Sequence, residues 1–221
     1  MIIPIYNEQR LIRNVLRRVR ALPFRKELVL VDDCSDDGTC EILKNEEAAR
    51  PDTILIRHDR NRGKGYAIRS GLTRATGDIV MIQDADLEYT PEEIPGLLEP
   101  IIEGRAAVVY GSRFMGSVKH MRLPNRVANW LLARMVSVLY GQRITDEATA
   151  YKIFRKEVIH SIRLTCERFE FCPEVTAKVL RKKLPILELP VTFEARTPEE
   201  GKKIGWRDFI TAVKVLVGCR F

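Results

Sequence analysis

Short apolar runs alternate with amphipathic segments through the first half of the chain. Runs with the composition of buried strands lie at residues 2–5, 27–31, 53–57, 79–83 and 106–111. Between them, residues 8–22, 39–50, 66–75 and 91–103 have the spacing of amphipathic helices. Regular alternation of strands and helices builds right-handed βαβ units, so the pattern predicts an α/β fold around a mostly parallel sheet.

The second half of the chain has a different pattern. It contains predicted helices at 125–140, 155–162, 173–182 and 206–217 and a strand at 186–193. A basic, glycine-containing stretch, residues 196–205, precedes the last helix. No segment has the composition of an interdomain linker, so we expect residues 1–221 to form one domain.

The composition fits such a domain and adds a bias toward anionic partners. The chain has 221 residues and a net charge of +7, which favours nucleic acid, phosphorylated metabolites or an acidic membrane surface without choosing among them. Its five cysteines lack the short spacing of a zinc site, and it has only three histidines. We therefore expect free thiols and a reducing, cytoplasmic location.

No segment predicts a signal peptide or a membrane-spanning helix. The longest apolar stretch, residues 130–140, is interrupted by Arg134 and is too short to span a bilayer. The last predicted helix is amphipathic, with Arg207, Lys214 and Arg220 interspersed among apolar residues. It is expected either to lie peripherally on a membrane surface or to close the core.

Three acidic residues follow the fourth predicted strand. Asp84, Asp86 and Glu88 are spaced two apart, so they lie on one face if the chain stays extended. Clustered carboxylates are costly unless a positive group compensates them, and Mg²⁺ takes one or two carboxylates beside phosphate oxygens. The segment indicates a metal-dependent enzyme that handles a phosphorylated substrate, with a solvated acidic loop as the alternative.

Polar clusters follow all five predicted strands of the first half. They are Tyr6-Asn7-Glu8, Asp32-Asp33, residues 61–64, residues 84–88 and Gly111-Ser112-Arg113. Ligands of parallel sheets bind beyond the carboxyl ends of the strands. Solvation alone explains five such clusters poorly, so this edge of the sheet is the predicted binding site.

In their order and spacing, these motifs resemble those of inverting family-two glycosyltransferases. The motifs are Pro4-Ile5-Tyr6-Asn7-Glu8, residues 31–39, residues 61–65, Asp84-Ala85-Asp86 and Gly111-Ser112-Arg113. More narrowly, the chain resembles the polyprenyl-phosphate branch, which includes dolichyl-phosphate mannose and glucose synthases. The resemblance covers nearly the whole chain and implies a GT-A fold, with residues 1–113 as the nucleotide-sugar-binding half and residues 114–221 as the acceptor-binding half.

The resemblance also implies which residues bind the donor nucleoside. Carried over by position, Pro4, Tyr6, Glu8, Val31 and Asp33 would hold it. An aromatic ring and carboxylates suit a base and ribose hydroxyls. Taken singly, Pro4 and Tyr6 could instead pack at a strand end, and Asp33 could be a turn or capping residue.

Asp84 and Asp86 resemble the family's Asp-x-Asp metal motif, and Ala85 between them is expected to lie in the donor site. Glu88 matches a position that can help to hold the cation, expected to be Mg²⁺ or Mn²⁺. The metal would bridge the donor diphosphate and offset the charge that grows on the leaving group. A solvent-facing acid is the alternative for Glu88.

Basic residues are expected to bind the two substrates' phosphates. Arg113 and Arg126 match positions that resemble the acceptor-phosphate clamp, for which a planar guanidinium is suited. Arg196 and Lys202 match a loop that resembles the family's lid over the donor, with Lys203 an equal candidate by its chemistry. The alternatives are a surface charge for Arg126 and a basic loop without a role.

The resemblance implies that catalysis depends on Asp84, Asp86 and Arg113. A hydroxyl acceptor would also need a carboxylate base, for which Asp146 is a candidate. A phosphate acceptor has a second pKa of about 6 and is largely ionised at neutral pH. Positioning by arginines can then suffice without a strong base.

We therefore expect a metal-dependent inverting enzyme that transfers a hexose from GDP-mannose or UDP-glucose to polyprenyl phosphate. One alternative is the same fold acting on a soluble glycan hydroxyl, in which case Asp146→Asn would abolish turnover. The other is a basic nucleic-acid-binding module without activity. The sequence lacks the interleaved aromatic and basic residues that would favour that module.

Overall fold

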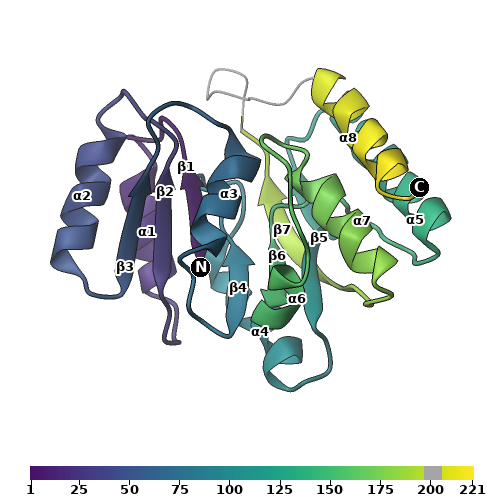
Figure 1. Cartoon of the computed structure of the whole chain (residues 1–221), viewed down its shortest axis with the longest axis horizontal. Helices are drawn as coiled ribbons and strands as arrows, with labels where there is room; N and C mark the ends of the chain where they lie inside the picture. Colours follow the sequence, from purple (N-terminus) through teal and green to yellow (C-terminus); the bar gives the residue numbers. More distant parts are fainter. Residues whose placement is uncertain (197–205) are drawn as a thin grey trace.

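In the computed structural model, which describes residues 1–196 and 206–221, a seven-stranded sheet runs through the middle of the molecule (Figure 1). The strands lie in the order β3-β2-β1-β4-β6-β5-β7. They are β1 (Ile2–Ile5), β2 (Leu28–Asp32), β3 (Thr53–Arg57), β4 (Ile79–Ile82), β5 (Val108–Lys119), β6 (Lys152–Arg155) and β7 (Leu187–Glu194).

Strands β1 to β4 form the parallel half that the alternating pattern predicts. β1 pairs in parallel with β2 and β4, and β2 pairs in parallel with β3. These strands therefore present their carboxyl ends at one edge of the sheet, where the polar clusters follow. The predicted α/β fold with a mostly parallel sheet is confirmed.

Helices cover both faces of the sheet. They are α1 (Ile12–Arg20), α2 (Thr39–Ala49), α3 (Lys64–Leu72), the short 3-10 helix η1 (Pro91–Glu93), α4 (Ile94–Ile102), α5 (Leu123–Tyr140), α6 (Lys156–His160), α7 (Phe171–Arg181) and α8 (Trp206–Gly218). Successive strand residues point to opposite faces, so Ile3 and Leu30 pack with α1 and α2, whereas Ile2 and Val29 pack with α3.

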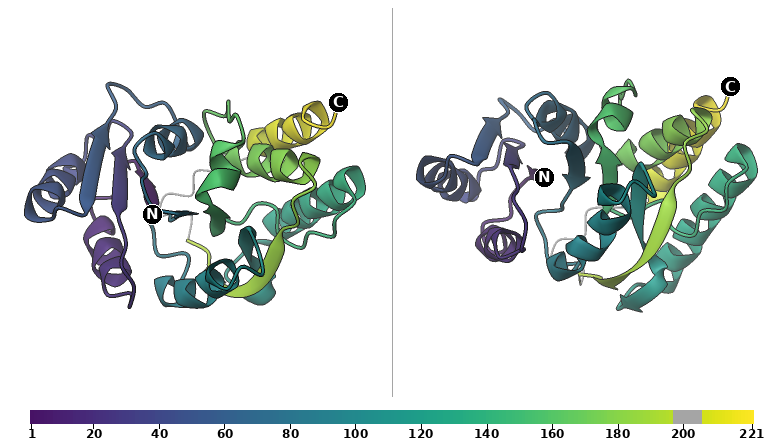
Figure 2. Two further views of the ribbon diagram at one scale, coloured as in Figure 1. Left: turned by 60° about the horizontal axis from the view of Figure 1, so that its bottom comes forward. Right: turned by 90° about the horizontal axis from the view of Figure 1, so that it is seen from below.

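The helices of the second half form a layer beside the sheet. Leu132 and Val136 of α5 share one hydrophobic cluster with Ala212 and Leu216 of α8 and with α7. Figure 2 shows the yellow α8 alongside α7 and α5 at the end of the molecule away from α2. This cluster also contains Ile2 of β1, so one core joins residues from both halves of the chain.

The sheet's second half departs from the sequence prediction. β6 was not expected, and it runs antiparallel between β4 and β5. It has only four residues and begins with Lys152, a charged residue that is fully buried here. β5 continues to Lys119 instead of ending near Gly111, because its outer part pairs with β7 across a register shift between Ser112 and Ser117. Neither β6 nor the outer part of β5 has the alternation of apolar and polar residues that predicts a strand from sequence.

The predictions on cysteines and membrane helices are consistent with the structure. All five cysteines are free. Over the residues that the structure describes, no helix is both long and apolar enough to cross a bilayer.

Replacing Gly116 with alanine is expected to destabilise the fold. A Cβ atom at this position would lie 2.7 Å from the backbone nitrogen of Val191, and closer still to its carbonyl oxygen, where β5 meets β7. Overpacking of this kind costs about 1–3 kcal/mol in the free energy of unfolding, measurable by denaturant titration. Gly96→Ala is the matched control, because its Cβ meets nothing within 4 Å and alanine favours the helix. Equal stability of the two variants would contradict the β5–β7 packing.

Candidate active site

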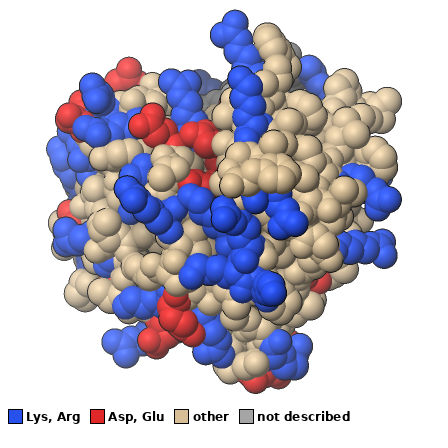
Figure 3. All heavy atoms as spheres, turned by 45° about the vertical axis from the view of Figure 1, so that its right-hand side comes forward, with Lys and Arg blue, Asp and Glu red and all other residues tan. Residues whose placement is uncertain are grey.

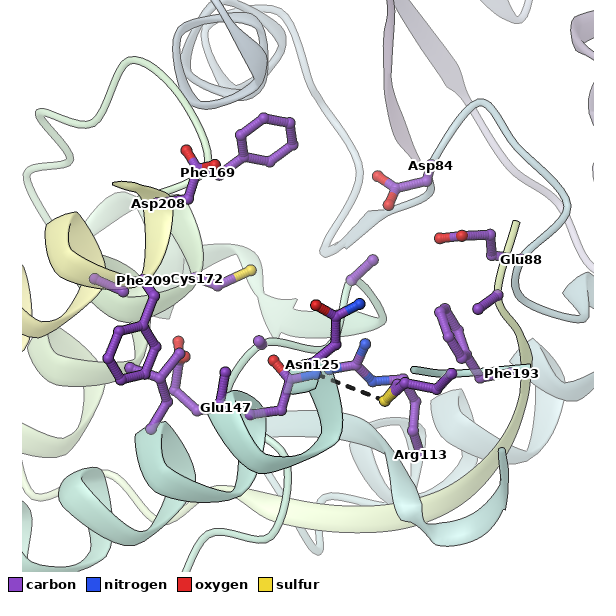
Figure 4. A pocket seen from close by; sticks show the side chains of 18 of the residues that line it. Asp84, Glu88, Arg113, Asn125, Glu147, Phe169, Cys172, Phe193, Asp208 and Phe209 are labelled. Atoms are coloured by element: carbon purple, nitrogen blue, oxygen red, sulfur yellow. Dashed lines mark hydrogen bonds between the residues drawn. The ribbon is translucent and has the colours of Figure 1, made fainter. Parts of the chain in front are cut away.

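A pocket of about 630 Å³ opens beyond the carboxyl ends of the parallel strands, between the two halves of the chain. Charged residues from the sheet edge line part of it, among them Asp84, Glu88 and Arg113. Helices α5, α7 and α8 supply an apolar wall, made by Pro124, Ala128, Leu132, Phe171, Phe209 and Ala212. Figure 4 shows Asp84 and Glu88 on one side of the pocket and Phe209 on the opposite side.

The three predicted metal-binding acids lie in the turn that follows β4. The chain does not stay extended here, because β4 ends at Ile82 and the backbone nitrogen of Glu88 donates a 3.1 Å hydrogen bond to Asp86 Oδ1. The carboxylates therefore do not repeat along one strand face. Within residues 1–196 and 206–221, no three side chains of aspartate, glutamate, histidine or cysteine converge as a preformed metal site.

Basic side chains from other elements compensate these acids. Lys64 Nζ at the start of α3 lies 2.5 Å from Asp84 Oδ1, and the Arg196 guanidinium lies 2.8 Å from Asp86 and 3.0 Å from Glu8. The backbone nitrogen of Arg196 also donates to Glu88 Oε1 at 2.8 Å. The acidic cluster thus connects β1, β4, α3 and the segment after β7.

Burial and neighbouring charges both shift the pKa values of Lys64 and Glu88. Burial alone would lower the pKa of Lys64, but the Asp84 carboxylate and other acidic neighbours outweigh it and raise that pKa. Burial raises the pKa of Glu88, and Asp84 adds to the increase. Lys64 therefore stays positively charged at neutral pH, beside the Asp84 carboxylate.

Arg113 is held by a second buried ion pair. Its Nε and Nη2 atoms each lie 2.7 Å from the Asp146 carboxylate, and its backbone nitrogen donates to the same group at 2.9 Å. Both side chains are buried, and the guanidinium lies 5.0 Å from the centroid of the Phe193 ring. Asp146 accepts three hydrogen bonds from Arg113, so it fixes the orientation of that guanidinium at the pocket wall.

The predicted nucleoside-binding residues occupy the ends of β1 and β2. Glu8 lines the pocket, while Pro4 and Tyr6 are half-buried at the end of β1 and Val31 is fully buried in β2. Their contacts with a nucleoside stay a prediction.

Asp33 has a definite structural role. Its buried carboxylate accepts hydrogen bonds from the backbone nitrogens of Arg62, at 2.9 Å, and Gly63, at 2.7 Å. It also lies 2.7 Å from Nδ1 of His58. Asp33 therefore orders the loop that leads into α3 and places Lys64.

Two other predicted residues, Arg126 and Ala85, lie apart from these contacts. Arg126 is exposed on α5 and is not among the residues that line the pocket, which at this point are Asn125 and Asn129. Ala85 is buried in the turn after β4. Lys202 lies outside the described residues. The binding roles of all three stay predictions.

Sequence reasoning missed Glu147, which lines the pocket and is fully buried. Neither of its carboxyl oxygens has a hydrogen-bond partner among the described residues. Burial raises the pKa of Glu147 to about 7, and the Asp146 charge adds to the increase. No motif marks this residue, because it lies in the turn before β6 and only the folded structure shows that its side chain is buried.

Comparison with known proteins identifies the family. Residues 1–163 match the profile of Glycosyl transferase family 2. The chain is 31% identical over 210 residues to the UDP-N-acetylglucosamine–dolichyl-phosphate N-acetylglucosaminyltransferase of Methanococcus voltae, which covers 86% of this chain and 83% of that protein. The chain therefore belongs to glycosyl transferase family 2, and it is a glycosyltransferase.

Two further relatives are longer than this chain. The undecaprenyl-phosphate 4-deoxy-4-formamido-L-arabinose transferase of Edwardsiella ictaluri is 32% identical over 99% of this chain and 66% of its own length. The dolichol-phosphate mannosyltransferase of Pyrococcus furiosus is 31% identical over 93% of this chain and 59% of its own length. The chain thus spans less than two thirds of both relatives.

A solved structure supports the GT-A fold. The glucosyl-3-phosphoglycerate synthase of Mycobacterium tuberculosis, crystallised with Mn²⁺, UDP and phosphoglyceric acid, superposes with a TM-score of 0.75 at 20% identity. The alignment covers 99% of this chain and 77% of that protein. At this identity the likeness establishes the fold alone.

Asp146→Asn is expected to destabilise the protein by about 3 kcal/mol, because Arg113 would remain buried without its counterion. Chemical denaturation measures the loss. Glu103→Gln is the control, since Glu103 pairs with Arg105 at the surface, where ion pairs contribute little. A loss no larger than that of the control would rule out a dominant Arg113–Asp146 interaction.

Proposed function

We propose that the chain transfers a hexose from a nucleotide-sugar to polyprenyl phosphate, with inversion at the anomeric carbon. The observation that supports this most is the composition of the pocket. Carboxylates and basic groups suited to phosphates lie on one side, and an apolar wall suited to a hydrocarbon lies on the other. The relatives that are named as transferases acting on dolichyl or undecaprenyl phosphate also support this proposal.

The donor diphosphate is proposed to bind near Asp84 and Asp86 together with a divalent cation. The oxygen-only donor set suits Mg²⁺ or Mn²⁺, which need few protein carboxylates when phosphate oxygens complete their coordination. Bound there, the metal would neutralise charge on the diphosphate leaving group. Glu88 is a third candidate ligand. A structural neighbour with this fold was crystallised with Mn²⁺ and UDP, which supports the proposal.

Arg113 is proposed to bind the acceptor phosphate. An oxygen of that phosphate attacks the anomeric carbon while the bond from this carbon to the nucleoside diphosphate breaks, and the diphosphate takes the electron pair. A phosphate acceptor is already ionised and needs no strong base. This favours it over a hydroxyl acceptor, because the most obvious base, Asp146, is occupied by three hydrogen bonds from Arg113.

Helices α5 and α8 are proposed to rest on the membrane that carries the acceptor. They expose large apolar side chains at Leu123, Trp130, Val138, Trp206 and Ile210. Exposed basic residues accompany them, namely Arg122, Arg126, Arg134, Arg207, Lys214 and Arg220. On the face shown in Figure 3, Lys and Arg side chains border an extended area of uncharged residues. Apolar surface with basic surroundings suits anionic headgroups.

A calorimetric screen of UDP-glucose and GDP-mannose, each with and without Mn²⁺, tests the donor assignment. One donor is expected to bind, with an affinity that requires the metal. Asp86→Asn is expected to weaken that binding by about tenfold, the equivalent of about 1.4 kcal/mol. Asp78→Asn, at the opposite end of β4, serves as the control and should bind normally. Metal-independent binding that tolerates Asp86→Asn would contradict the proposed site.

Membrane association can be followed by intrinsic fluorescence, because both tryptophans of the chain, Trp130 of α5 and Trp206 of α8, are exposed. Vesicles containing phosphatidylglycerol are expected to shift the emission to shorter wavelength, and added salt should reverse part of the shift. Vesicles of phosphatidylcholine alone provide the control and should have a smaller effect. An unchanged emission with anionic vesicles would argue against docking through this face.

A further inference from the structure

Glu147 is the one buried carboxyl group in the described part of the pocket lining with no hydrogen bond to either oxygen. Its neighbour Asp146 is equally buried, but Arg113 satisfies it. Leaving a buried polar group without a partner is unfavourable, and most buried polar groups in folded proteins have one. Glu147 is therefore a costly residue for the free protein, and a bound ligand could supply the missing partner.

The surroundings of Glu147 restrict what that ligand can be. The charged and titratable groups that act on its carboxyl group are Lys152, Asp146 and Arg113, and Glu147 in turn acts on the thiol of Cys172. Lys152 Nζ donates to the backbone carbonyl of Glu147 at 2.6 Å and lies 3.7 Å from the Tyr110 ring centroid. With two cationic side chains nearby, the carboxyl group is a poor site for a metal ion.

The other chemical groups of the proposed substrates already have counterparts in the pocket. Lys64, Arg113 and Arg196 supply positive charge for phosphates, and the apolar wall suits a hydrocarbon chain. No pocket residue has so far been assigned to the hydroxyl groups of the sugar. A carboxyl group pairs well with them, because it accepts hydrogen bonds in either form and also donates one when protonated. The raised pKa of Glu147 keeps much of it protonated near neutral pH.

We infer that Glu147 is a sugar-binding residue, whose carboxyl group hydrogen bonds a hydroxyl group of the hexose that the enzyme transfers. The inference rests on the proposed function, since it requires the hexose to enter this pocket. It gives Glu147 a part in distinguishing one sugar from another, because a buried hydrogen-bonding group discriminates against sugars that leave it unpaired.

Calorimetry with four probes in the presence of Mn²⁺ tests this inference: UDP, UDP-glucose, GDP and GDP-mannose. For the nucleotide that binds, Glu147→Leu is expected to leave the Kd of the nucleoside diphosphate unchanged. The same variant should weaken binding of the corresponding nucleotide-sugar by about tenfold, the loss expected for one buried hydrogen bond. Glu147→Gln keeps the shape and, like a protonated carboxyl group, offers both a hydrogen-bond acceptor and a donor, so it should retain most of the affinity for the nucleotide-sugar.

Glu174→Gln provides a matched control for a purely structural role. Glu174 is also buried but lies outside the pocket lining, and it accepts hydrogen bonds from the backbone nitrogens of Thr165 and Cys166, each at 2.8 Å. This variant should lower the thermal midpoint without changing the ratio of the two Kd values. Glu147→Leu should change the ratio of the two Kd values. It should not lower the thermal midpoint, because it removes an unsatisfied group from the interior.

Three results would overturn the inference. An unchanged ratio of Kd values in Glu147→Leu would exclude a contact with the sugar. Loss of turnover in Glu147→Gln with normal binding of the nucleotide-sugar would assign the residue to proton transfer instead. If the wild-type protein binds none of the four probes, the proposed function itself fails and the inference fails with it.

Discussion

The requirement that buried charges be compensated shapes the whole active-site region. Carboxylates gather in the turn after β4, and the cations that neutralise them come from α3 and from the segment after β7. Arg113 of β5 and Asp146 of the loop before β6 form a second compensated pair of this kind. These pairs join segments distant in sequence, so the electrostatics of the site and the assembly of the two halves depend on the same contacts.

The parallel half of the fold could be predicted because its signal is local. β1 and β3 are apolar runs of four and five residues, and the structure reproduces the bounds expected for both. β6 could not be predicted in the same way, because its burial depends on two neighbouring strands and its first residue is a lysine. Tertiary contacts determine the secondary structure of such a segment, and the periodicity of its sequence does not predict it.

Site residues that belong to a sequence motif could be predicted. Residues whose role depends on a contact with a distant part of the chain could not. Asp84, Asp86, Glu88, Arg113 and Arg196 stand in recognisable patterns, and all of them line the pocket. That Asp146 holds Arg113, 33 residues away, could not be read from spacing. Glu147 could not be predicted either. It is a candidate because its carboxyl group is buried without a hydrogen-bond partner, and only a structure reveals that.

The central claim is that the acidic turn after β4 binds the diphosphate of a nucleotide-sugar through a divalent cation. A crystal structure of the protein with Mn²⁺ and the preferred nucleotide-sugar tests it most directly. The account predicts anomalous density for manganese between the diphosphate and Asp86 or Asp84, with the Arg196 guanidinium no longer paired to Asp86. A nucleotide bound elsewhere, with both the Lys64–Asp84 and Arg196–Asp86 pairs intact, would contradict it.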